Sequence, residues 1–80
     1  AIFGERHPTV ANSYNNIGLV YHNQGNSPAA LENYNKALCV FIELFGKHNP
    51  YTASMYASIS RLYFSQGKYF AALKYFWKGL

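Results

Sequence analysis

The stretch SYNNIGLVYHNQG, residues 13–25, decides the fold because it returns 42 residues later as MYASISRLYFSQG, residues 55–67. When the whole chain is shifted by 42, 14 of the 38 aligned pairs are identical. Self-similarity at a period of about 20–50 residues is typical of arrays of stacked structural units. We therefore expect two copies of one supersecondary unit to account for nearly all of the 80 residues.

Each copy is predicted to contain two helices. Apolar residues recur at spacings of three and four, as on one face of a helix. In the first copy they are Val10, Tyr14, Ile17 and Tyr21, then Ala30, Tyr34, Ala37, Phe41 and Leu44. In the second copy they are Tyr56, Ile59 and Tyr63, then Ala72, Phe76 and Leu80. These stripes predict helices over about 9–24, 28–45, 51–65 and 69–80.

The residues between the stripes fit helix ends and close packing. Gly25 follows the first stripe, where a breaker is expected. Ser27 before Pro28 reads as an N-cap residue followed by proline at the first helical position. Gly46 fits the position just past a helix end. The small residues Gly18, Ala30 and Ala72 are expected to let paired helices approach closely.

These residues resemble the tetratricopeptide repeat, whose signature is Trp-x₂-Leu-Gly-x₂-Tyr followed by Ala-x₃-Phe. The first copy supplies Tyr14, Ile17, Gly18, Tyr21, Ala30 and Tyr34, and the second supplies Tyr56, Ile59, Ser60, Tyr63, Ala72 and Phe76. The period of 42 and the linker Phe3-Gly4-Glu5-Arg6-His7-Pro8 resemble the longer variant of kinesin light chain and nephrocystin-type proteins. The resemblance implies an all-α fold, an α-α superhelix, or solenoid, of antiparallel helix pairs.

The repeat also predicts the organisation of the chain. Residues 1–7 align with the tail of a preceding repeat and its linker, residues 8–46 form repeat 1, and residues 47–80 form a truncated repeat 2. Stacked repeats contact only their neighbours, and terminal repeats normally carry a polar outer face. The last helix is instead rich in aromatic residues, so we expect Tyr75 and Trp77 to cover a neighbouring repeat or a second chain.

The composition argues against an enzyme. The only acids are Glu5, Glu32 and Glu43, with no Asp, which is too few for paired-carboxylate hydrolysis, an Asp-containing triad or a calcium loop. No histidine has a second ligand at zinc spacing, so no metal or other cofactor is expected. Cys39 is the one cysteine, which favours a reducing compartment such as the cytoplasm. We expect it to be a structural, partly buried thiol. No apolar run is long enough to span a bilayer.

The face opposite the packing stripe is the candidate binding site. In tetratricopeptide arrays the first helix of each repeat lines the concave groove, so the resemblance implies a protein–protein interaction scaffold that binds an extended peptide there. The implied residues are Asn12, Asn15, Asn16, Leu19, His22 and Asn23 in repeat 1, and Ser54, Ala57, Ser58, Arg61 and Phe64 in repeat 2. An asparagine amide both donates and accepts hydrogen bonds, so it can bind peptide backbone whatever the sequence. Arg61 can pair with a carboxylate.

A second hypothesis rests on charge. Residues 44–80 hold five of the seven Lys and Arg residues and no acid. Lys68, Lys74 and Lys78 alternate with aromatic residues, as on a surface that binds nucleic acid or an anionic membrane. The same charge would bias a peptide site toward acidic partners.

Overall fold

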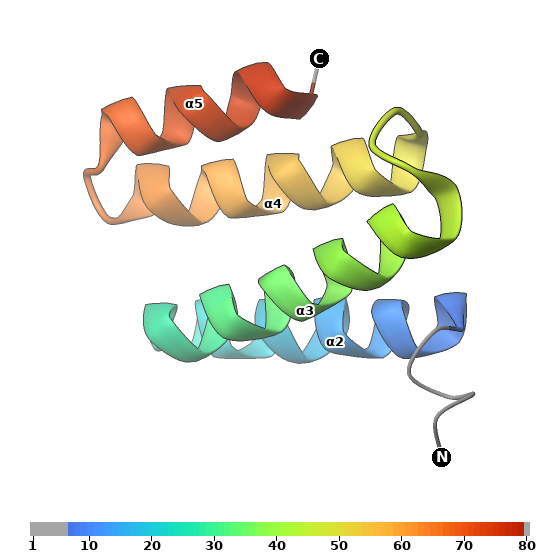
Figure 1. Cartoon of the computed structure of the whole chain (residues 1–80). Coiled ribbons are helices and arrows are strands. Elements are labelled where there is room, and N and C mark those ends of the chain that lie inside the picture. The colour runs from blue at the N-terminus through green and yellow to red at the C-terminus, as the bar shows by residue number, and fades with distance from the viewer. Residues whose placement is uncertain (1–6, 80) are drawn as a thin grey trace.

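The computed structural model of the chain describes residues 7–79, which form four helices (Figure 1). They are α2 (Pro8–Asn23), α3 (Ser27–Phe45), α4 (Pro50–Ser65) and α5 (Tyr69–Gly79). Each bound lies within one residue of the range expected from the apolar stripes. The expected tail of a preceding repeat over residues 1–6, and the place of Leu80 in the last stripe, lie outside the described residues.

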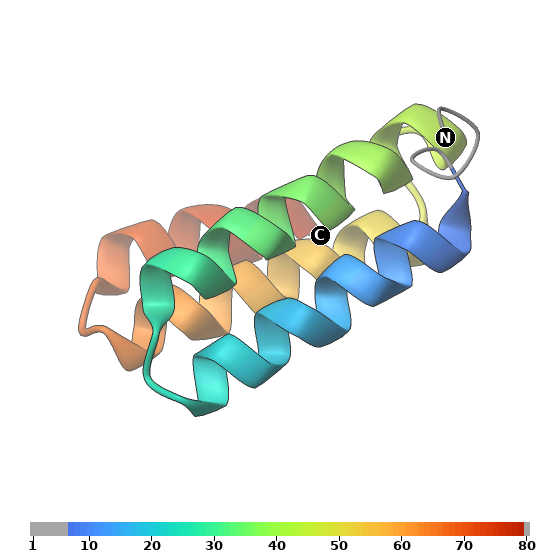
Figure 2. The ribbon, with the colours of Figure 1, turned by 90° about the horizontal axis from the view of Figure 1, so that it is seen from below.

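The four helices form two layers. Consecutive helices run antiparallel, and Figure 2 shows α2 and α4 in one layer with α3 and α5 in the other. α2 packs on α3, α4 packs on α5, and α3 also packs on α4. The Cα atoms occupy 37 × 27 × 13 Å, and the shortest dimension is that of two packed helix layers. The fold is the all-α helical repeat that the sequence predicts.

Local side-chain hydrogen bonds start the first three helices. His7 Nδ1 accepts from the Thr9 amide at 3.1 Å, and Asn49 Oδ1 accepts from the Tyr51 and Thr52 amides at 2.9 and 3.0 Å. The expectation that Ser27 is an N-cap is wrong, because Asn26 Oδ1 accepts from the Ala29 amide and Ser27 is the first helical residue. An asparagine next to a serine offers the chain two possible caps, and the pattern alone does not choose between them.

The connection between the repeats is fixed by a compact set of bonds. Gly46 ends α3 with a φ of +83°, a conformation that favours glycine. Asn49 Nδ2 donates to the Gly46 carbonyl at 2.6 Å and to Thr52 Oγ1 at 2.8 Å, and Thr52 Oγ1 donates to the same carbonyl at 2.9 Å. Thr52 is fully buried, so these bonds satisfy a hydroxyl that would otherwise be costly to bury. They hold the start of α4 against the end of α3.

The core lies around α3. Its buried residues come mainly from one side of α3 and the facing side of α4. They are Ala30, Tyr34, Ala37, Leu38, Val40 and Phe41 from α3, and Met55, Ile59 and Leu62 from α4. α2 adds Ala11 and α5 adds Ala72. α3 therefore belongs to repeat 1 and packs on helices of both repeats, α2 and α4.

Four residues depart from the expected packing. Ile17, Leu44 and Phe76 belong to the predicted stripes, yet each is exposed. Ile17 and Phe76 lie on the outermost helices, where no described helix covers them, and Leu44 lies in the last turn of α3. Tyr75, expected to face outward, instead lies against Tyr63, with ring centroids 5.4 Å apart, and packs on the core. Trp77 does lie outside, as expected. The helical period locates a stripe but not the neighbour that buries it.

Gly18 allows α2 and α3 to meet closely. A Cβ built at this position would lie 2.7 Å from the Tyr34 ring and 3.2 Å from the Ala30 carbonyl oxygen. Tyr34 and Ala30 are both buried. The Tyr34 ring therefore occupies the space that a side chain at position 18 would need.

We expect Gly18→Ala to lower the free energy of unfolding by about 1–2 kcal/mol. Overpacking typically costs about 1–3 kcal/mol, and the better helix propensity of alanine returns up to about 1 kcal/mol. Gly79→Ala is the matched control, because a Cβ there meets its nearest atoms at 3.4 Å. Urea unfolding followed by circular dichroism measures both. Equal stability of the two variants would contradict the close approach.

Candidate functional site

The candidate site is the outward side of the layer formed by α2 and α4, which we call the α2/α4 face. It consists of Asn12, Asn15, Asn16, Leu19, His22 and Asn23 on α2, and Ser54, Ala57, Arg61 and Phe64 on α4. The two helices are related by the shift of 42 and lie side by side in one layer, so equivalent positions point the same way (Figure 2). Asn15 and His22 are half-buried, and the other eight residues are exposed.

Ser58, the remaining predicted binding residue, lies at the edge of this face and is buried. It is 7% exposed and sits one helical turn from the buried residues Met55 and Leu62, on the side of α4 that faces the first repeat. A side chain so enclosed cannot contact a ligand directly, so Ser58 is not part of the α2/α4 face. Its equivalent in the first repeat, Asn16, occupies the same position at the edge of the α2/α4 face, and it is exposed because no described helix lies beyond α2.

One contact joins the two helices within the face. His22 Nε2 lies 3.4 Å from Ser65 Oγ. The Ser65 hydroxyl proton is already donated to the Leu62 carbonyl at 2.7 Å, so in this contact the imidazole donates and the serine oxygen accepts. Ser65 was missing from the sequence-based set, although the shift of 42 aligns it with Asn23 and so could have found it.

Arg61 dominates the electrostatics of the face. It is the only Lys, Arg, Asp or Glu residue in α2 and α4, and it is exposed. Within residues 7–79 its guanidinium makes no ion pair. Burial raises the pKa of the Tyr34 phenol above its usual 10.0, and the positive charge of Arg61 partly offsets that rise. The face is thus a neutral amide surface carrying one cation.

The described residues show no arrangement typical of catalysis or metal binding. No three His, Cys, Asp or Glu side chains gather to hold a metal ion within residues 7–79. His7 caps α2 and His48 is exposed in the connection between repeats. The expectation that Cys39 is partly buried is wrong, because it lies on the solvent side of α3 and is exposed.

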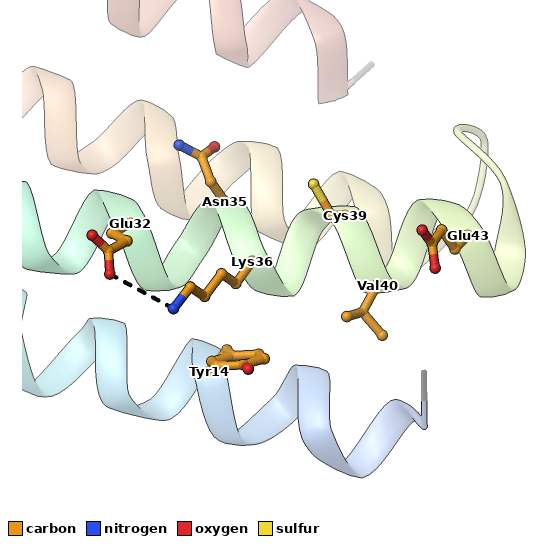
Figure 3. Close-up of a pocket in the computed structure, with 7 residues that line it drawn as sticks. All are labelled: Tyr14, Glu32, Asn35, Lys36, Cys39, Val40 and Glu43. Atoms are coloured by element: carbon orange, nitrogen blue, oxygen red, sulfur yellow. Dashed lines mark ion pairs between the residues drawn. The ribbon is translucent and has the colours of Figure 1, made fainter. Parts of the chain in front are cut away.

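A shallow hollow of about 670 Å³ lies on the opposite side of the molecule, along α3 (Figure 3). It is lined by Tyr14, Glu32, Asn35, Lys36, Cys39, Val40 and Glu43. Lys36 Nζ lies 3.6 Å from Glu32 Oε1 and 5.5 Å from the centre of the Tyr14 ring. The hollow is absent from the sequence-based predictions, although all of its lining residues except Tyr14 recur along α3 at helical spacing.

The hollow does not form a carboxylate pair. Glu32 and Glu43 are eleven residues apart on one helix, which separates them by about 16 Å along its axis. General acid–base work on one bond needs carboxyl groups roughly 5–10 Å apart. The ion pair of Glu32 with Lys36 is exposed, and such pairs contribute little to stability. The hollow therefore offers polar side chains, but its two carboxylates are too far apart to act as a pair.

The fold and the α2/α4 face define a helical-repeat protein of the kind that presents a surface to other molecules. A family model described as tetratricopeptide repeat matches residues 9–80, and the chain belongs to this family. Members are generally protein–protein interaction modules and typically non-enzymatic scaffolds. A search of curated proteins finds no match. The kinesin-light-chain-like subtype stays a prediction. Among residues 7–79, no helix combines the length and apolarity needed to cross a membrane.

The raised pKa of Tyr34 predicts a loss of stability in alkali. The folded protein holds this proton more tightly than the unfolded chain, so the contribution of Tyr34 is complete below about pH 10 and is lost as the pH rises further. Tyr34→Phe should flatten this decline. Urea unfolding of both proteins from about pH 9 to about pH 11 measures it. A parallel decline in the two would contradict the assignment.

Proposed function

We propose that the α2/α4 face binds an extended, acidic segment of a protein partner. The observation that carries the proposal is the combination, on a single face, of four asparagines with one cation that makes no ion pair within residues 7–79. The family to which the chain belongs generally acts by binding proteins.

The asparagines suit a peptide backbone better than a particular side chain. An extended peptide presents alternating N–H and C=O groups, and each carboxamide supplies a donor and an acceptor. Asn12, Asn16 and Asn23 are exposed, and none of their side chains makes a hydrogen bond within residues 7–79. Their amides are available for a ligand. Leu19 and Phe64 lie on the same face, about half and two-thirds exposed, and supply apolar contacts for alternate peptide side chains.

Arg61 supplies the preference for an acidic segment. Its guanidinium can bind a carboxylate with two parallel hydrogen bonds, a geometry that lysine cannot reproduce. The net charge of +4 adds long-range attraction, which speeds association more than it tightens the complex. Cys39 is an exposed free thiol, and this supports a reducing location such as the cytoplasm.

The structure gives less support to binding of nucleic acid or an anionic membrane by the basic half. Lys78 Nζ lies 4.8 Å from the centre of the Tyr75 ring, and Lys68 Nζ lies 5.9 Å from that of Tyr63. Those two rings stack on each other inside repeat 2, so they are not free to stack on bases. Lys74 is the remaining exposed cation of the three.

We expect Arg61→Glu to weaken binding of an acidic peptide by about tenfold or more, because a charge-assisted hydrogen bond contributes about 1.5–3 kcal/mol. Asn12→Ala combined with Asn15→Ala should weaken acidic and neutral peptides alike, since these amides address the backbone. Fluorescence anisotropy with labelled members of a random-peptide selection measures both effects. The proposal fails if binding survives all three substitutions.

Lys74→Glu is the matched control for charge, because it makes the same change on an exposed helix outside the face. It should leave peptide affinity within about twofold of the original. If Lys74→Glu is instead the damaging change, and affinity for single-stranded nucleic acid falls steeply with salt, the second hypothesis is correct.

A further inference from the structure

Tyr34 is buried as a side chain, yet its hydroxyl has no partner in the described part of the chain. The residue is 2% exposed and belongs to the core. Within residues 7–79 the hydroxyl makes no hydrogen bond. Among the same residues, every side-chain nitrogen or oxygen that is fully enclosed does have a partner. The Tyr34 hydroxyl is therefore not enclosed: it reaches the surface at the end of a ring that is buried.

Packing alone does not account for this hydroxyl. The repeat signature has phenylalanine at the position of Tyr34, and repeat 2 of this chain has Phe76 there. A phenylalanine ring would fill the same space in the core. The hydroxyl adds a group that needs a hydrogen-bond partner, from water or from a ligand. Its place on the surface thus decides what it can do.

The packing of α2 beside α4 shows where the hydroxyl emerges. The two helices run in the same direction, because each is antiparallel to α3 (Figure 1). His22 on α2 and Ser65 on α4 meet at 3.4 Å across the line between the two helices. Gly18 and Arg61 stand one helical turn before these two residues, each on its own helix. Gly18 and Arg61 therefore lie opposite each other across the same line.

Gly18 leaves the opening that the Tyr34 ring fills. Two carbon atoms of the ring lie 2.7 and 2.8 Å from the place of a Cβ at position 18, so the ring passes where a side chain of α2 would otherwise stand. The hydroxyl at its tip then emerges on the α2/α4 face, beside Arg61. The electrostatics agree with this placement. Burial raises the pKa of the Tyr34 phenol, and the charge of Arg61 acts on the phenol in the opposite direction.

We propose that the Tyr34 hydroxyl and the Arg61 guanidinium bind the same carboxylate of the acidic segment. The inference rests on the proposed function of the α2/α4 face and assigns it a further specificity-determining residue, one that comes from α3. The carboxylate accepts two N–H bonds from Arg61 and one O–H bond from Tyr34. Because the Tyr34 ring is enclosed, its hydroxyl is held in place before the ligand arrives, and binding loses little side-chain entropy there.

The surroundings of the two donors suit an anion. α2 and α4 contain no Asp or Glu, so no acid on these helices competes for Arg61 or repels a ligand carboxylate. The Ser65 hydroxyl, one turn beyond Arg61, already donates to the Leu62 carbonyl. A carboxamide in place of the carboxylate would lack the charge that Arg61 binds. The site should therefore distinguish glutamate from glutamine in the same peptide.

The test measures binding of two probes by fluorescence anisotropy. They are the tightest glutamate-containing peptide of the random-peptide selection and the same peptide with glutamine in place of that glutamate. Tyr34→Phe should weaken the glutamate peptide by about tenfold, the effect of one hydrogen bond to a charged group. It should leave the glutamine peptide within about twofold. In an Arg61→Gln background the effect of Tyr34→Phe should shrink, because the two donors act on one group.

Tyr14→Phe is the matched control. It removes the same atom from a half-buried tyrosine of the same repeat, and Tyr14 lines the hollow on the opposite side of the molecule (Figure 3). This variant should bind both peptides as the wild type does. Urea unfolding at neutral pH checks the fold of Tyr34→Phe. It should match the wild type, because the deleted hydroxyl makes no hydrogen bond within residues 7–79.

Ionisation of the phenol gives a second readout, which a purely structural role would not change. The ultraviolet difference between wild type and Tyr34→Phe follows the Tyr34 phenol during an alkaline titration. A saturating amount of the glutamate peptide should raise the pH at which Tyr34 ionises, because the bound carboxylate repels the phenolate. The glutamine peptide should leave that pH unchanged.

The outcomes separate this inference from the proposed function. If Arg61→Glu weakens the glutamate peptide and Tyr34→Phe does not, Tyr34 is not a binding residue and the proposed function stands. If Tyr34→Phe weakens both peptides equally, the hydroxyl does not bind the carboxylate, and the inference is again wrong. If binding survives Arg61→Glu together with the two asparagine substitutions, the proposed function fails and this inference fails with it.

Discussion

The packing of α4 on α3 is the interaction on which the rest of the structure depends. Met55, Ile59 and Leu62 are buried where α4 packs on α3, and α3 also packs on α2. A slab two helices thick has no single centre that could protect these residues otherwise. The bonds of Asn49 and Thr52 to the Gly46 carbonyl fix the start of this packing, and the side chains then complete it.

The same dependence explains the two exposed ends. Each repeat has two apolar sides. Among residues 7–79, no helix covers the outer side of α2 or of α5. Ile17 and Phe76 are exposed for this reason, although their sequence positions are those of the buried residues Ile59 and Tyr34. The aromatic residues of α5 show both situations: Tyr75 packs on the core, and Trp77 is exposed on the outermost helix.

The α2/α4 face and the hollow along α3 differ in what their chemistry can do. The face presents uncharged amides around one cation, which suits recognition of backbone and an acid. The hollow contains Glu32, Lys36 and Glu43, but spacing along one helix keeps the two carboxylates apart. The chemistry of the face therefore suits peptide binding better than that of the hollow does.

The sequence by itself determined four helices, their pairing and most of their limits, because apolar period, caps and glycine positions act over a few residues. It also placed Asn12, Leu19 and Arg61 on one exposed side. Only the tertiary structure decided that Ser58 is buried and that Cys39 is exposed. The physical reason is that burial depends on a neighbour, so residues at equivalent positions of the two repeats, such as Ile17 and Ile59, differ when a helix covers one and not the other.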